Sequence, residues 1–263
     1  MQVDPRNSLS EDLIFAPKVT LVAASQVVNW PDFAHGEGQG QGRFPERLVE
    51  LAGRECYDSW GRGRKSPEYH AHIAEALHGS VLEHANFTFR ISGVSRYLTH
   101  ELIRHRAGCA VSQRSTRYVD EGRACVVVPP ALIITETDSA ERAQEKRARQ
   151  ADLLTFTKQG LAIYRQLSVS ASTTARKTMR GAARAFLPSQ LETSLIWTAN
   201  ARALLNVIEQ RFSDAADAEI CRLTGLLLTE MAVEMPSYFG GARRQLRSDG
   251  LGDCLVPGTL RAF

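Results

Sequence analysis

Length, composition and charge are those of an ordinary globular protein. The 263 residues are enough for one large domain or two small ones with an ample hydrophobic core. An apolar share of 43% and a charged share of 23% exclude disorder of the whole chain. The net charge of +3 is too small to indicate a nucleic-acid partner by itself.

The N-terminal segment MQVDPRNSLSED is polar and lacks the apolar core of a signal peptide. No apolar run reaches the length of a membrane span. The five cysteines are widely spaced and form no C-x-x-C motif, so neither a disulfide framework nor a zinc site is predicted. We therefore expect a reducing, cytoplasmic location, with no metal, no membrane and no nucleic acid as partner.

The N-terminal half predicts strands and helices in mixed order. Ser66-Pro67 is typical of a helix start, with an N-cap followed by proline. Alternation of Phe87, Phe89 and Ile91 with polar residues predicts a half-buried strand. The expected elements are a loose arm over 1 to about 15, strands over 19–28 and 86–92, helices over 44–52, from 66 to about 79 and over 95–106, a loop over 107–117, and a short apolar run over 126–130.

A glycine-rich segment runs from His35 to Arg43. It resembles a phosphate-cradling loop, but it lacks both the Walker lysine and the dinucleotide-binding spacing. Its composition favours a flexible loop.

The C-terminal half predicts mainly helices. A long helix opens at Asp138-Ser139, and a short one ends near Leu187-Pro188. A strand over 192–198 places Leu195 and Trp197 on one face, and helices follow over 200–211 and 217–234. With no internal repeat and no long linker, the fold class is α+β: one domain over 1–263, with a small mixed or antiparallel sheet and several long helices.

The strongest chemical feature is Arg104-His105-Arg106 at the end of a predicted helix, followed by the run from Ser112 to Tyr118. Guanidinium groups, an imidazole, hydroxyls and an amide are what a phosphate and a ribose require. The arginines at 104, 106, 114 and 117 form a local cluster that suits a small anion better than a long polyanion. The alternative is a solvated basic helix end that complements the helix dipole.

The helix over 200–211 carries polar residues at matching spacing. Asn200 and Arg211 are 11 residues apart, which places them within roughly 20° of one face, and Arg202 and Asn206 are i,i+4 neighbours. This pattern indicates an edge that faces a ligand. A polar face toward solvent is the alternative.

These motifs together resemble the flavin-dependent thymidylate synthase family. The likeness covers roughly residues 50–240, and its motifs fall in the family's order. They are His78-x-Ser80-x-x-Glu83-His84, Phe87-Thr-Phe89, Arg104-His-Arg106 with eight residues before Ser115, Arg184-Ala-Phe-Leu-Pro188, Trp197-Thr-Ala-Asn200, Arg202, Asn206 and Arg211. The resemblance implies the family's fold and an interlocked homotetramer whose active sites draw on several subunits.

The resemblance also implies roles. FAD would contact His78, Ser80, Arg104, His105, Arg106, Asn200, Arg202 and Asn206, with Cys56 nearby. The nucleotide and its phosphate would be held by Gln113, Ser115, Thr116, Arg117 and Arg184. Arg211 would polarise the uracil at N3 as the catalytic group. Methylenetetrahydrofolate would supply the carbon and NADPH the electrons, with no cysteine nucleophile.

Three departures from the family pattern leave the substrate open. Glu101 replaces a common glutamine near the nucleotide and is counted with the substrate-binding residues. Ala215 stands where some members of the family have a histidine. The loop from Ala107 to Val111 is one residue longer than the common version and is built of small residues. A looser loop would enlarge the nucleotide pocket and admit a 2′-hydroxyl. The expected substrate is dUMP, UMP or both. A non-catalytic nucleotide- or RNA-binding module is the alternative from another class.

Overall fold

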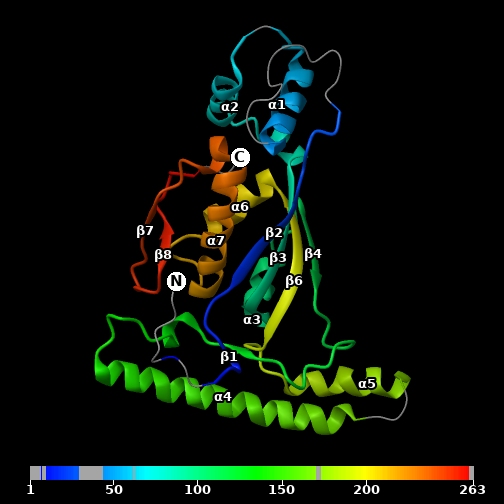
Figure 1. Ribbon diagram of the computed structural model, residues 1–263, viewed down its shortest axis with the longest axis vertical. Helices are drawn as coiled ribbons and strands as arrows, with labels where there is room; N and C mark the ends of the chain where they lie inside the picture. Colours follow the sequence, from blue (N-terminus) through cyan, green and yellow to red (C-terminus); the bar gives the residue numbers. More distant parts are fainter. Residues whose placement is uncertain (1–6, 8–9, 30–43, 62, 170–172, 261–263) are drawn as a thin grey trace. The chain divides into compact units, whose positions relative to one another are not determined.

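A computed structural model describes residues 7, 10–29, 44–61, 63–169 and 173–260. In that part the chain is a mixed α+β structure with several helices and small sheets, as predicted (Figure 1). It forms two compact units: a first unit of Met1–Lys18, Ile91–Leu102 and Ser112–Leu195, and a second of Val19–Arg90, Ile103–Val111 and Ile196–Phe263. The single domain stays a prediction.

The largest sheet has four strands in the order β2-β3-β6-β4: β2 (Lys18–Ala24), β3 (Asn86–Ser95), β6 (Glu192–Asn200) and β4 (Cys109–Gln113). Both strands predicted from alternation, over 86–92 and 192–198, are confirmed. In β6 the alternate residues Thr193, Leu195 and Trp197 are buried, because strand side chains point to opposite faces in turn.

Strand β4 lies within the stretch 107–117, for which the prediction of a loop is wrong. The residues just before and just after β4 are hydrogen-bonded to β6. Arg114 N donates to Ser194 O at 3.0 Å, and Asn200 N donates to Gly108 O at 3.0 Å. No residue of β4 is fully buried. An edge strand of this kind carries no alternation of apolar and polar residues for a sequence pattern to detect.

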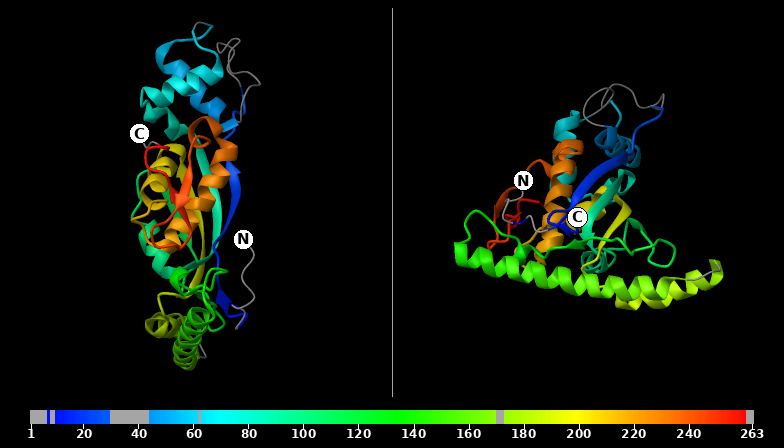
Figure 2. Two further views of the ribbon diagram at one scale, coloured as in Figure 1. Left: turned by 90° about the vertical axis from the view of Figure 1, so that its left-hand side faces the viewer. Right: turned by 60° about the horizontal axis from the view of Figure 1, so that its bottom comes forward.

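The first unit is organised around a long helix. It contains α3 (Arg96–Leu102), η3 (Pro130–Leu132), α4 (Ala140–Ser168), α5 (Thr173–Ala183), η4 (Arg184–Phe186), and β1 (Leu13–Ile14), which pairs in parallel with β5 (Val126–Val127). Leu13, Val126, Val128 and Ile133 form a core against which Leu153 and Leu154 of α4 pack. Helices α4 and α5 lie side by side (Figures 1 and 2). The Ser139 side chain caps α4 by accepting from Arg142 N, which confirms the predicted start.

The prediction of a loose arm is wrong for the described residues at the N-terminus. Asn7 is buried and makes two hydrogen bonds of 2.8 Å with the backbone of Ile134. Leu13 and Ile14 pair with β5. The polar composition suggested a loose arm, but these residues are held by backbone partners that are distant in the sequence.

The second unit contains α1 (Phe44–Tyr57), α2 (Ser66–Glu75), η2 (Gly79–His84), α6 (Ala201–Arg211), α7 (Ala218–Glu234) and α8 (Pro236–Phe239). Strands β7 (Arg244–Leu246) and β8 (Asp253–Leu255) pair antiparallel. Helix α6 packs against η2 and α7. Trp197 stacks on Phe89 at 6.2 Å in the core of this unit.

Several boundaries differ from the sequence prediction. Helix α3 ends at Leu102, so Arg104, His105 and Arg106 lie in the connection to β4 and not in the last helical turn. The glycine-rich segment His35–Arg43 lies outside the described residues. Among the described residues no helix has both the length and the apolar character needed to cross a membrane.

Candidate active site

The Arg104-His105-Arg106 triplet is followed by a tight turn. Cys109 N donates to Arg106 O at 3.2 Å, and Gly108 has a φ of 69°, which favours glycine. A Cβ at Gly108 would lie 2.5 Å from Nδ2 of Asn200. The turn is therefore docked closely on Asn200, and the expectation of a looser loop is wrong.

Asn200 also caps helix α6. Its Oδ1 accepts from Ala203 N at 2.8 Å, and the residue is only 9% exposed. A side-chain oxygen at this position satisfies a backbone N–H that has no partner within the helix. Asn200 thus joins the turn after the triplet to the start of α6. Its implied contact with FAD stays a prediction.

The triplet and one face of α6 line a hollow of about 530 Å³ in the second unit. Five residues that the resemblance assigns to the flavin or to catalysis are among those lining it. The lining residues are Arg104, His105, Arg106, Ala107, Ala203, Asn206, Val207, Gln210 and Arg211. Three arginines at one concave surface attract an anionic ligand, and the small alanines leave room for a ring.

His105 and Arg211 are bonded to each other across this hollow. Arg211 Nε donates to His105 Nε2 at 2.9 Å, so Nε2 accepts and the ring proton sits on Nδ1. Burial, and then the charge of Arg211, lower the pKa of His105 below its ordinary value. The imidazole is therefore neutral near pH 7, and the bond orients the guanidinium of Arg211.

Arg202 does not line this hollow. Its Nη1 lies 2.5 Å from Oε1 of Glu83 in η2, and the two side chains are 42% and 50% exposed. The i,i+4 neighbour Asn206 does line the hollow and accepts a hydrogen bond from Gln210 at 2.8 Å. Of the polar face predicted on α6, the described structure brings Asn206 and Arg211 to the hollow and leaves Arg202 in a surface ion pair.

His78 lines a second, smaller hollow of about 220 Å³ in the same unit, with Tyr57 and His72 among its neighbours. The His78 ring stacks on Tyr57 with centroids 5.9 Å apart. Its Nδ1 is buried and has no hydrogen-bond partner among the described residues. Such an atom fits a ligand that offers a polar group. Ser80 is exposed on η2, and Cys56 is exposed on α1.

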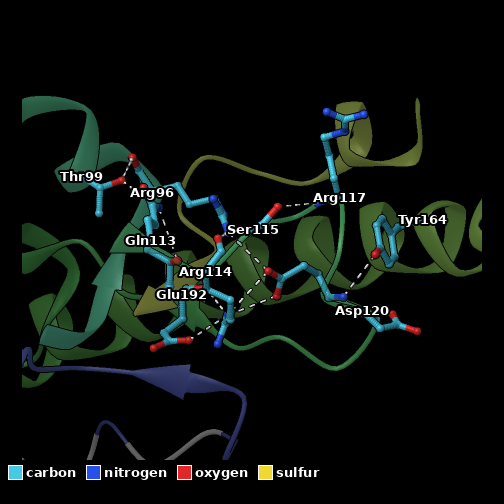
Figure 3. A network of polar contacts seen from close by, with 12 residues as sticks. Arg96, Thr99, Gln113, Arg114, Ser115, Arg117, Asp120, Tyr164 and Glu192 are labelled. Carbon is cyan, nitrogen blue, oxygen red and sulfur yellow. Dashed lines mark hydrogen bonds and ion pairs between the residues drawn. The ribbon is translucent and has the colours of Figure 1, made fainter. Parts of the chain in front are cut away.

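Except for Arg211, the residues assigned to the nucleotide belong to the first unit. Figure 3 shows three of them, Gln113, Ser115 and Arg117. Gln113 is held by two hydroxyls, with its Nε2 3.2 Å from Thr99 Oγ1 and 3.4 Å from Thr193 Oγ1. Ser115 Oγ accepts from Arg117 N at 3.3 Å. Of the others, Thr116 and Glu101 are half-buried, while Arg117 and Arg184 are exposed.

Arg114 does not belong to the anion-binding cluster predicted from the sequence. It forms ion pairs with Glu121 at 3.2 Å and Glu192 at 3.1 Å (Figure 3). Glu121 is almost fully buried and also pairs with Arg96 at 3.3 Å. With its charge neutralised, Arg114 fixes the backbone beside Gln113 and Ser115. Sequence reasoning missed these carboxylates because nothing in their local spacing marks them.

Comparisons with known proteins show which family the chain belongs to. Residues 42–237 match the Thy1 family, described as "Thymidylate synthase complementing protein". The chain is 38% identical over 248 residues to a flavin-dependent thymidylate synthase of Mycobacterium marinum, covering 89% of this chain and 92% of that protein. It is 40% identical over 215 residues to that of Mycobacterium tuberculosis, covering 77% and 82%. The crystal structure of the UMP/dUMP methylase PolB from Streptomyces cacaoi, bound with 5-Br UMP, matches with a TM-score of 0.63 at 23% identity, covering 86% and 93%.

Fold, site and relatives define a flavoenzyme of the methyltransferase type. The chain belongs to the family of the flavin-dependent thymidylate synthases. The alternative of a non-catalytic binding module is therefore wrong. The residues present fit a flavin: the hollow beside the triplet offers cations and space, and the buried Nδ1 of His78 has no hydrogen-bond partner in the described part of the chain.

Proposed function

We propose that the protein methylates C5 of a uracil nucleotide, taking dUMP and also UMP. In the net reaction, the nucleotide, methylenetetrahydrofolate, NADPH and a proton give the 5-methyl nucleotide, tetrahydrofolate and NADP⁺. The observation that carries the proposal is the hollow that joins the Arg104-His105-Arg106 triplet to Asn206 and Arg211.

The flavin in this proposal is FAD, which supplies the reducing equivalents when bound. Arg104 and Arg106 provide charge for its phosphates, since a guanidinium can form two parallel hydrogen bonds to a phosphate. The other assigned contacts are His78, Ser80, His105, Asn200, Arg202 and Asn206. The Arg202–Glu83 pair is exposed and is worth little, so a ligand can replace it at small cost.

Arg211 is the proposed catalytic group. A guanidinium at the N3 edge of the uracil stabilises the negative charge that develops on the ring and makes C5 more nucleophilic. Neutral His105 fixes the Nε side of Arg211 and so orients the guanidinium. A protonated His105 would repel Arg211 and break this bond.

The nucleotide is held by Gln113, Ser115, Thr116, Arg117 and Arg184, with Glu101 beside them. No cysteine serves as nucleophile: burial raises the pKa of Cys109, which disfavours the thiolate. The working assembly is a homotetramer in the cytoplasm, in which the flavin residues of one subunit and the nucleotide residues of others complete each site.

The expected sugar preference rests on the small size of the residues after the triplet and not on a loose loop, since Gly108 is docked on Asn200. An apolar wall rejects an added hydroxyl by only about 10²-fold. We therefore expect UMP to be methylated as well as dUMP. Anaerobic turnover with NADPH and methylenetetrahydrofolate, measured for both nucleotides under identical conditions, gives the ratio of kcat/KM.

A preference for dUMP above about 10³-fold would contradict the assignment of UMP as a substrate. Turnover of neither nucleotide by the flavin-loaded protein would contradict the proposed reaction itself. Omitting methylenetetrahydrofolate is the matched control for the carbon donor, and replacing NADPH by NADH tests the reductant.

A further inference from the structure

A third hollow lies in the first unit, where α4 ends and α5 runs beside it. Its volume is about 440 Å³. Three arginines and one carboxylate line it, so we name it the arginine hollow. The lining residues are Asp120, Arg165, Ser168, Val169, Arg176 and Arg180. None of them takes part in the site described above.

The chain around the arginine hollow is strongly basic. Between Asp152 and Glu192 the sequence contains no aspartate or glutamate and six lysines and arginines. The lining of the hollow includes three arginines and one carboxylate, that of Asp120. The lining therefore has a net charge of about +2, which attracts and concentrates an anion of matching charge.

Two of the three guanidiniums are held in place. Arg180 donates from Nη1 to Tyr118 O at 3.0 Å and pairs through Nη2 with Asp120 at 3.1 Å. Arg165 Nε donates to Gly122 O at 2.7 Å. A ligand that binds groups already ordered does not have to order them, so such groups bind more tightly.

Arg176 supplies the third charge. It lies one helical turn before Arg180 on α5, at the i,i+4 spacing that places two side chains on one face. The residue is exposed, and it forms no ion pair within the part of the chain that the structure describes. Among the described residues no carboxylate pairs with this charge, so it is available to a ligand.

We propose that the arginine hollow binds a dianion of the phosphate class, carried by a small molecule. Planar guanidinium groups match the oxygens of a phosphate in bidentate geometry, and a doubly charged group balances the lining. The volume lies within the range of small-molecule sites, so there is room for the phosphate and part of its carrier. This site is distinct in its residues from the nucleotide set at Ser115, Thr116 and Arg117.

Binding there acts on a segment next to the nucleotide residues. Arg165 and Arg180 hold the backbone from Tyr118 to Gly122, and Val119 N donates to Ser115 O at 3.0 Å. An anion bound by these arginines adds contacts that keep them on this segment, and so reduces the opening of the segment. If Ser115 and Arg117 bind the nucleotide, the two ligands are coupled, and the coupling is reciprocal. Only this last step rests on the proposed function.

The test is calorimetric titration of the full-length holoenzyme with inorganic phosphate at low salt. Arg176→Ala is expected to weaken the site by about 10- to 100-fold, the loss typical of one hydrogen bond to a charged group. Arg149→Ala is the matched control, because Arg149 is an exposed arginine on α4 paired with Asp152. Arg117→Ala removes an arginine of the nucleotide set, and so shows whether phosphate binds at the nucleotide residues instead of the arginine hollow.

The proposal is supported if Arg176→Ala loses phosphate binding at the arginine hollow while Arg149→Ala and Arg117→Ala keep it. Loss only in Arg117→Ala, equal loss in the control, or no binding to the wild type overturns it. As a second readout, phosphate is expected to slow amide exchange over 118–122 in the wild type and not in Arg176→Ala. Both measurements need no turnover, so an inactive enzyme with intact phosphate binding would reject the proposed function and leave the arginine hollow standing.

Discussion

Replacing Arg211 by glutamine should raise the pKa of His105. The two side chains are joined at 2.9 Å, and the charge of Arg211 disfavours a second charge on the imidazole. Two unit charges about 4 Å apart interact with about 1 kcal/mol in water and about 4 kcal/mol at an effective dielectric constant near 20. Burial lowers the pKa of His105 first and the charge of Arg211 second, so Arg211→Gln should raise this pKa while burial still holds it below its ordinary value.

The assay is an NMR titration of the histidine ring resonances. Arg202→Gln is the matched control, since it removes the same charge from the same helix at a residue paired with Glu83. In that control the pKa of His105 should not move. An unchanged pKa in Arg211→Gln, or an equal rise in both variants, would refute the assignment of the Arg211–His105 pair.

The lowered pKa also fixes the sign of a stability effect. Below the ordinary value of about 6.5, the unfolded chain takes up a proton at His105 that the folded protein resists. The unfolded state then binds more protons, so stability falls as the pH drops from about 6.5 to the lowered pKa. Denaturant unfolding at several pH values should show this fall in the wild type, and a smaller one in Arg211→Gln.

The remaining predictions concern catalysis and the frame of the site. Arg211→Ala should lower methyl transfer by about 10²- to 10³-fold while NADPH still reduces the flavin, and near-normal methylation would exclude the assigned role. Gly108→Ala should cost about 1–3 kcal/mol in the free energy of unfolding and loosen flavin binding, because it strains the backbone and presses on Asn200; unchanged denaturation would contradict the tight turn. Glu121→Gln should lower the free energy of unfolding by about 2–3 kcal/mol, as measured by chemical denaturation. This is somewhat less than the loss of a fully buried ion pair, because the arginine partners of Glu121 keep some contact with water. Cys109→Ser should stay active, and complete loss with intact folding and flavin would overturn the mechanism without a thiol.

The sequence by itself determined the helices and the two central strands of the sheet. Alternation at Phe87 and Phe89 and at Leu195 and Trp197 marks half-buried strands, and Asp138-Ser139 marks the start of the long helix. These signals are local, because they depend on which face is buried and on the first backbone N–H groups of a helix. The family motifs were equally visible, since they are short runs in a set order.

Only the tertiary structure decided which arginines can meet a ligand. Arg114 and Arg106 look alike in the sequence, yet Arg114 is neutralised by Glu121 and Glu192, and Arg106 lines the hollow. The contacts of Asn7 with Ile134, the edge strand β4 and the Arg211–His105 bond were hidden in the same way. All four depend on partners distant in sequence, and a side chain's charge and pKa are set by the neighbours that folding brings to it.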